Sequence, residues 1–173
     1  MGANNYTNYL NNTSFQYTHQ FVRNVLQLNR GLVPEYGHPV FSEIALSAGI
    51  EATDWSWTPL VADFDGDGWR DVIITNGFPK DITDKDFMDY QSENMAFIAK
   101  TEMLKKIPQV KLKNYAFRNN HDMSFANVSS NWGIHTTTFS NGAAYGDIDN
   151  DGDLDYIVNN INDIANVYQN NTK

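Results

Sequence analysis

The sequence has no cysteine and no long apolar run. The absence of cysteine excludes a disulfide scaffold, a thiolate zinc site and a cysteine nucleophile. The longest apolar run, residues 95–99, is too short to cross a bilayer, and the first residues lack the basic and apolar regions of a signal peptide. Because 41% of the 173 residues are hydrophobic, we expect a packed domain, or a piece of a larger one, and not a disordered chain.

Basic residues are scarce as well. The chain has 12 Lys and Arg against 21 Asp and Glu, for a formal net charge of −9. The excess acid lies in two dense clusters, at 63–71 and 147–155, and the rest of the chain is balanced in charge. Without a basic stripe to displace counterions, the chain is not expected to bind nucleic acid.

The chain contains two copies of one unit. When the sequence is shifted so that Asp63 meets Asp147, Gly49 meets Gly133 and the two acidic clusters coincide. Residues 166–171 resemble 114–119 and indicate the start of a third copy, with Asn166 in the place of Asn114. Such self-similarity is typical of repeat architectures. Each copy has four short strand-like segments bounded by Asn and Gly, which predicts a mainly β fold of four-stranded antiparallel β-propeller blades.

A different kind of segment separates the two copies. Residues 84–107 have helical periodicity, and residues 83–86 (Thr-Asp-Lys-Asp) predict a capping box at the start of the helix. We expect this helix either to pack on the sheet or to dock another domain through its methionines, Met88, Met95 and Met103. The predicted organisation is a polar segment (1–20), a first blade (21–77), a helical insertion (78–113), a second blade (114–165) and the start of a third (166–173).

Both acidic clusters read Asp-x-Asp-x-Asp-Gly-x-x-Asp. Alternate carboxylates on a tight loop converge on one centre, and the glycine allows the sharp turn. All-oxygen donors favour a hard cation, and a crowded shell with a backbone carbonyl favours Ca²⁺ over Mg²⁺. The sequence therefore predicts two calcium sites. The carboxylate ligands are Asp63, Asp65, Asp67 and Asp71 in the first loop and Asp147, Asp149, Asp151 and Asp155 in the second, with Trp69 and Asp153 at the carbonyl position.

Other calcium loops fit the pattern less well. An EF-hand requires an acid at position twelve, where this chain has Ile74 and Val158. Loops followed by a helix are disfavoured because strand-like residues come next. What remains is a loop between two antiparallel strands, or else a solvated acidic turn that binds no metal.

Two stretches resemble a known family. Residues 124–160, SFANVSSNWGIHTTTFSNGAAYGDIDNDGDLDYIVNN, resemble FG-GAP (VCBS-type) repeats, the calcium-binding blades of integrin α-subunit propellers. Residues 54–77, DWSWTPLVADFDGDGWRDVIITNG, are similar to a second such blade. With residues 23–29 (RNVLQLN), the FSEIALSAGI segment and the insertion, the chain also resembles bacterial surface proteins of the cartilage-acidic-protein-like type. Family propellers usually close with more blades, so the resemblance implies a fragment of a larger propeller or a short chain that self-associates.

The resemblance also implies a setting and a role. It implies a secreted or outer-membrane, cell-surface bacterial protein whose structural calcium supports binding, adhesion or scaffolding. The ligand, a protein or a glycan, stays unidentified. Catalysis finds no support, because the chain has no recognisable catalytic motif and His19, His38, His121 and His135 are scattered. The alternative is part of a surface carbohydrate- or ester-processing enzyme whose catalytic groups lie elsewhere.

Overall fold

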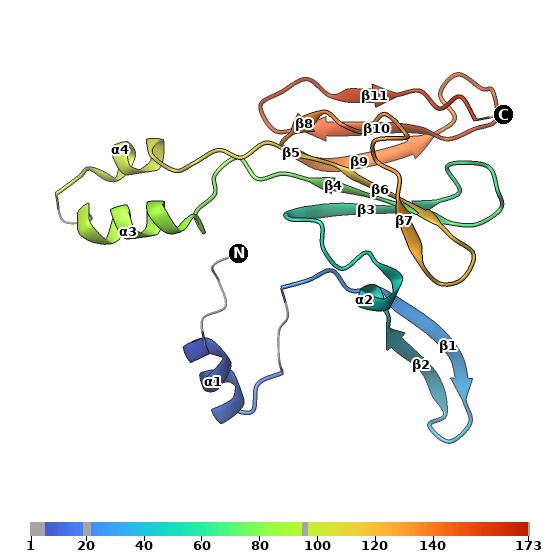
Figure 1. Cartoon of the computed structure of the whole chain (residues 1–173), viewed down its shortest axis with the longest axis horizontal. Coiled ribbons are helices and arrows are strands. Elements are labelled where there is room, and N and C mark those ends of the chain that lie inside the picture. The colour runs from blue at the N-terminus through green and yellow to red at the C-terminus, as the bar shows by residue number, and fades with distance from the viewer. Residues whose placement is uncertain (1–5, 19–21, 95–96, 173) are drawn as a thin grey trace. The chain divides into compact units, whose positions relative to one another are not determined.

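The structure is a computed structural model that describes residues 6–18, 22–94 and 97–172 (Figure 1). His19 and Met95, both named above, lie outside the described residues. The chain divides into two compact units. The smaller unit comprises Met1–Val22 and Phe78–Val110, and the larger comprises Arg23–Gly77 and Lys111–Lys173.

The larger unit consists of short strands and one helical turn, α2 (Ala45–Ala48). Its strands, in chain order, are β1 (Gln27–Val33), β2 (His38–Glu43), β3 (Ser56–Ala62), β4 (Asp71–Asn76), β5 (Leu112–Lys113), β6 (Tyr115–Asn119), β7 (Phe125–Asn127), β8 (Thr137–Thr138), β9 (Ser140–Gly146), β10 (Asp155–Asn160) and β11 (Asn166–Tyr168).

All paired strands in this unit are antiparallel. One sheet has four strands in the order β3-β4-β6-β7, and a second has three in the order β11-β10-β9. The pairs β1-β2 and β5-β8 form two-stranded sheets. The prediction of a mainly β protein built from antiparallel blade-like sheets is confirmed.

The strands of one sheet do not all come from the same copy of the sequence repeat. The four-stranded sheet takes β3 and β4 from the first copy and β6 and β7 from the second, so its boundaries fall inside the predicted blades 21–77 and 114–165. The reason is the pairing of β4 with β6, which sets Val72 opposite Phe117. Both side chains are buried in one apolar cluster together with Ile74. Each acidic hairpin thus supplies two strands of a sheet, and the next copy supplies the strands that follow.

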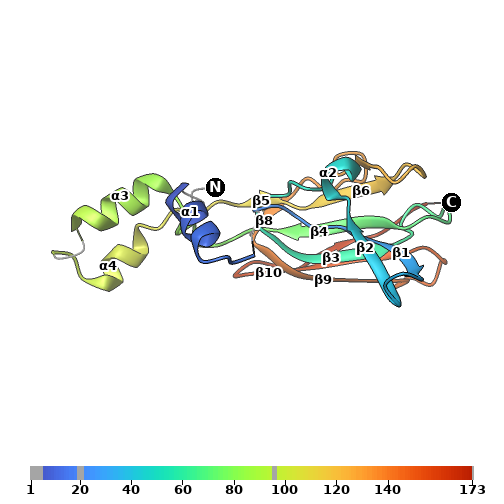
Figure 2. The same cartoon turned by 90° about the horizontal axis from the view of Figure 1, so that it is seen from below.

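The core of the larger unit comprises two apolar clusters, and the cluster that contains Val72 also contains Ala45 of α2. All six residues of β4 are buried, as expected for a central strand with neighbours on both sides. A second apolar cluster draws on both sheets, with Ile73 and Ala116 from one and Tyr156 and Val158 from the other. The sheets meet along β3 and β9 (Figure 2), where the Thr58 hydroxyl donates to a main-chain carbonyl of β9.

Gly77, directly after β4, is required by a close backbone approach. Its φ is +135°, and a Cβ at this position would lie 2.7 Å from the carbonyl oxygen of Thr138 and 2.8 Å from the Cα of Phe139. Any side chain would therefore push apart the backbones of the two sheets at this point.

The smaller unit contains three helices within the described residues: α1 (Tyr6–Ser14), α3 (Lys85–Asn94) and α4 (Lys100–Lys105). The single helix predicted for 84–107 is wrong, because the chain turns after α3. Ala99, just before α4, is extended, with φ −60° and ψ 139°. The turn allows Phe87 of α3 to pack with Met103 of α4 and with Ile107, and all three side chains are buried. Burial of this cluster outweighs the propensity for one continuous helix.

Two local predictions in this unit are corrected. The helix cap is Asp84, whose Oδ1 accepts the Phe87 N–H at 2.8 Å, whereas the Thr83 hydroxyl donates to Asp81. The methionines do not share one exposed face, since Met103 is buried while Met88 is 39% exposed. Within the described residues, no helix is long and apolar enough to cross a membrane.

Candidate metal centres

Each predicted metal loop connects two neighbouring antiparallel strands. The first loop, residues 63–70, joins β3 to β4, and the second loop, residues 147–154, joins β9 to β10. At the end of each loop the chain enters a strand directly, as the sequence predicted. The strand pair therefore fixes the two ends of each loop against one another.

The backbone turns at the fourth and sixth positions of both loops, where φ is positive. The sixth position is glycine in each loop, Gly68 and Gly152. The fourth is Gly66 in the first loop and Asn150 in the second. Asparagine is among the few other residues that tolerate this left-handed conformation. The change from glycine to asparagine therefore leaves the path of the loop unchanged.

The first aspartate of each loop organises the turn. Asp63 accepts the Asp67 N–H on Oδ1 at 3.1 Å and the Gly68 N–H on Oδ2 at 2.8 Å. Asp147 accepts the two corresponding N–H groups, each at 3.1 Å. The fifth-position carboxylate in turn accepts the N–H of the seventh residue, at 2.8 Å from Trp69 and at 3.2 Å in the second loop. The same hydrogen bonds thus shape both loops.

The ninth-position aspartates, Asp71 and Asp155, are buried and doubly bonded. In each, Oδ2 accepts the N–H of the loop's second residue, at 3.0 Å and 2.9 Å respectively. Oδ1 accepts an N–H from a different strand or its end, from Asn119 for Asp71 and from Asn170 for Asp155, both at 2.9 Å. These bonds fix the orientation of each carboxylate.

The two ninth-position carboxyls differ in acidity. Burial raises the pKa of Asp71, although its two backbone hydrogen bonds oppose this, and the charges of Asp65 and Asp67 raise it further. The backbone N–H groups that Asp155 accepts, first of all that of Asn170, lower the pKa of its carboxyl. Burial thus outweighs the backbone hydrogen bonds at Asp71, whereas the backbone hydrogen bonds outweigh burial at Asp155.

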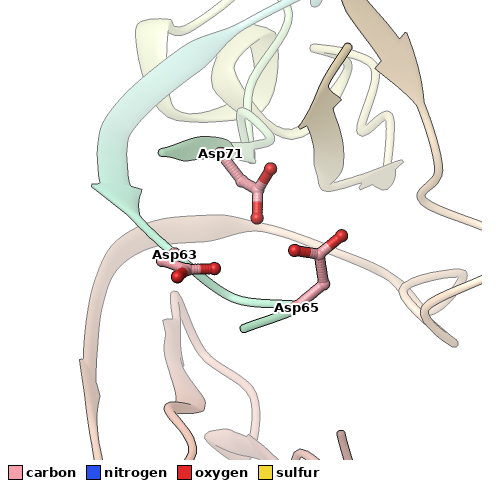
Figure 3. A group of neighbouring side chains, drawn as sticks. All are labelled: Asp63, Asp65 and Asp71. Atoms are coloured by element: carbon pink, nitrogen blue, oxygen red, sulfur yellow. The ribbon is translucent and has the colours of Figure 1, made fainter. Parts of the chain in front are cut away.

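Three carboxylates converge in the first loop. Asp63, Asp65 and Asp71 each present an oxygen within 4.8 Å of the others (Figure 3). Two oxygens bound to one Ca²⁺ at about 2.3–2.6 Å lie at most about 5 Å apart. The spacing of these oxygens therefore fits joint coordination of a single ion.

The second loop gathers a different set. Asp147, Asp149 and Asp151 bring their oxygens within the same 4.8 Å, and the Gln169 amide donates to Asp149. The side chain of Asp153 has both carboxylate oxygens buried without a hydrogen-bond partner. Burial and the neighbouring Asp151 raise the pKa of Asp153. A buried, unpaired carboxylate is costly, and a cation in this loop would lower that cost.

The first loop has a histidine contact that the scattered positions of the histidines in the sequence do not indicate. His121, which follows β6, places Nε2 2.7 Å from Asp67 Oδ2. The imidazole also stacks on Trp69, with ring centroids 4.8 Å apart and planes 15° from parallel. The hydrogen bond to His121 lowers the pKa of Asp67. In this arrangement Asp67 faces His121 and stays outside the cluster of the first loop.

The alignment of the third copy with the second copy differs by one residue from the predicted alignment. The sheet register sets Tyr115 opposite Ile74 and Asn166 opposite Val158, and Ile74 and Val158 are equivalent positions of the repeat. Asn166 therefore corresponds to Tyr115 and not to Asn114. Strand pairing, which the sequence alignment could not show, decides this frame.

The donor chemistry of both loops fits a hard cation. The converging ligands are carboxylate oxygens, which suit calcium, magnesium or manganese and not a soft metal.

The comparisons with known proteins support the resemblance in part. Residues 111–158 match the family described as FG-GAP-like repeat. The matched segment contains β6, β9 and the second loop, and it ends within β10. No curated protein matches the chain. These residues are thus similar to an FG-GAP-like repeat, and they lie in a mainly β fold.

Proposed function

We propose that the chain is a calcium-binding β-propeller segment of a secreted or cell-surface protein, with a role in adhesion, binding or scaffolding. Its two calcium ions are structural. The observation that carries this proposal is the shared architecture of the two loops. Both use the same hydrogen bonds and the same pair of positive-φ positions to bring three carboxylates within 4.8 Å.

Electrostatics explains why the loops should take up cations. Carboxylates about 5 Å apart repel each other by nearly 1 kcal/mol in water and by several kcal/mol at intermediate dielectric. A divalent ion converts this repulsion into coordination. Calcium modules outside cells typically bind with dissociation constants of ~10⁻⁴–10⁻³ M.

The position of the loops favours a structural role for calcium. Each loop is held by two paired strands and by a buried aspartate, so an ion would stiffen one end of a sheet and would not expose a new surface. A calcium sensor needs an element with two alternative packings. Remaining propeller blades, a second copy of the chain, or a protein or glycan ligand are the partners that this role implies.

Isothermal titration of chelator-treated protein with CaCl₂ tests the proposal. We expect two binding events in the wild type, one event in Asp63→Ala and one in Asp147→Ala. Asp163→Ala is a matched control, because its carboxylate pairs with Lys111 away from both loops. Absence of saturable calcium binding by the wild type, or loss of binding in the control as well, would contradict the proposal.

A further inference from the structure

Two asparagines occupy the same position relative to the two metal loops. Asn119 ends β6, and three bonds tie it to the first loop and its own turn. Its N–H donates to Asp71 Oδ1 at 2.9 Å, its Nδ2 donates to the carbonyl of Arg70 at 3.0 Å, and its Oδ1 accepts the N–H of His121 at 2.9 Å.

Asn170, after β11, repeats this pattern at the second loop. Its N–H donates to Asp155 Oδ1 at 2.9 Å, its Nδ2 donates to the carbonyl of Leu154 at 3.3 Å, and its Oδ1 accepts the N–H of Thr172 at 3.1 Å. The same amide also donates to the carbonyl of Phe64 in the first loop, at 2.6 Å. The two asparagines thus hold both the ninth-position carboxylate and the backbone just before it.

We infer that Asn119 and Asn170 are positioning residues for the two calcium sites, and that they couple each site to the third strand of its sheet. The inference rests on the proposed calcium binding. An ionised carboxylate can accept about four hydrogen bonds. Asp71 and Asp155 use one acceptor position on each oxygen for an N–H group, and the remaining lone pairs are left for a cation.

The amide side chain of each asparagine performs a second task. By donating to the carbonyl of the residue before the aspartate, it fixes the backbone from which the ninth-position aspartate projects. Asp71 is a member of the converging cluster of the first loop, whereas Asp155 is a predicted ligand outside the three carboxylates that converge in the second. Partners that hold a metal ligand in place typically change metal affinity by about 10–100-fold when they are removed. Neither asparagine carries a charge, so its effect on affinity comes through geometry.

A third asparagine allows the positioning of a loop aspartate to be distinguished from simple turn formation. In the β1-β2 pair, Asn29 lies opposite Phe41, as Asn119 lies opposite Phe125 in the β6-β7 pair. The Oδ1 of Asn29 accepts the N–H of Gly31 at 2.8 Å, which reproduces the turn made by Asn119. Among the described residues, the hydrogen bonds of Asn29 include none to a loop aspartate. Asn29 therefore forms the turn without serving a metal loop.

The coupling spans different lengths of chain. Asp155 and Asn170 are 15 residues apart, whereas Asp71 and Asn119 are 48 residues apart and lie on either side of the helical insertion. Calcium in the first loop should therefore reinforce the pairing of β4 with β6 across the insertion. The amide hydrogens of Asn119 and Asn170 should exchange more slowly when calcium is bound.

Calcium titrations of single-site variants test the inference. Asp147→Ala isolates the first site, and in this parent Asn119→Ala should weaken calcium binding by about 10–100-fold. Asn119→Ser keeps an oxygen acceptor for the turn but loses the donor to the Arg70 carbonyl, so its affinity should be intermediate. Asn29→Ala, the matched control, should bind as the parent does. In the Asp63→Ala parent, Asn170→Ala should weaken the second site in the same way.

The outcomes distinguish the inference from the function on which it rests. If the parent variants bind no calcium, the proposed function fails. If the parents bind calcium and Asn119→Ala binds as tightly, or if Asn29→Ala loses as much affinity, the positioning role is overturned. If Asn119→Ala does not fold, Asn119→Ser and the amide exchange of the wild type give the answer, and an exchange rate at Asn119 that is insensitive to calcium would refute the coupling.

Discussion

The two aspartate loops have the same positive-φ positions and differ in their surroundings. In both, the first aspartate accepts the N–H groups of the fifth and sixth residues, and the ninth accepts two more from the loop and a third strand. In the first loop, however, Asp67 is bound to His121, whereas its equivalent Asp151 belongs to the second cluster. Features common to both loops therefore belong to the fold, and the choice of converging carboxylates depends on neighbours outside the loop.

The largest expected effect tests whether the ninth aspartate is part of the fold. Asp71→Ala leaves two N–H groups without their acceptor, one of them in a buried bond. Each such loss costs about 1–3 kcal/mol, so the free energy of unfolding should fall by about 2–6 kcal/mol even in chelator. Urea denaturation measures this change. A loss that is seen only in calcium would show that Asp71 acts as a ligand alone.

The exposed first aspartate of the second loop should behave in the opposite way. In Asp147→Ala, water replaces the carboxylate as the partner of the loop N–H groups, so stability in chelator should change little. In calcium at a hundredfold excess over the dissociation constant, loss of the site should cost about 2.7 kcal/mol. Melting temperatures in calcium and in chelator provide the measurement. Equal losses in both buffers would contradict a metal role for Asp147.

His121→Ala tests whether His121 causes the difference between the two loops. It removes the partner that holds Asp67 away from the first cluster. A hydrogen bond contributes about 0.5–1.5 kcal/mol net, so calcium affinity at the first site should rise by up to about tenfold, with no change at the second. Calcium titration in the Asp147→Ala parent measures this effect. A decrease in affinity would show that His121 supports the site and does not compete with the metal.

The smallest effect concerns the residue after the ninth aspartate. This residue is Val72 in the first copy and Tyr156, which is 3% exposed, in the second. Burial raises the pKa of Tyr156 above the value of about 10 that tyrosine has in unfolded chains. Above the pKa of unfolded tyrosine, the Tyr156 hydroxyl loses its proton in the unfolded chain but keeps it in the folded chain. The free energy of unfolding therefore falls as pH rises. Tyr156→Phe should make this fall shallower in urea denaturation between neutral and alkaline pH, and an unchanged slope would exclude Tyr156 as its source.

The local structure of the loops could be predicted because it depends on nearby residues. The glycine at position six and the glycine or asparagine at position four set the turn, and the strand-like residues on both sides set the hairpin. The break between α3 and α4 could not be predicted in this way. It follows from the packing of Phe87 on Met103, a contact between residues far apart along the predicted helix.

The repeat, the two acidic hairpins and the residue types able to hold a hard cation can be read from composition and from spacing along the chain. The choice of strands that share a sheet depends on long-range packing, and this packing places Asn119 beside Asp71 and His121 beside Asp67. Hydrogen bonds between strands join residues that can be any distance apart in the sequence, so spacing along the chain does not predict which residues pair. The buried end of each metal loop is therefore completed by the strand that packs next to it.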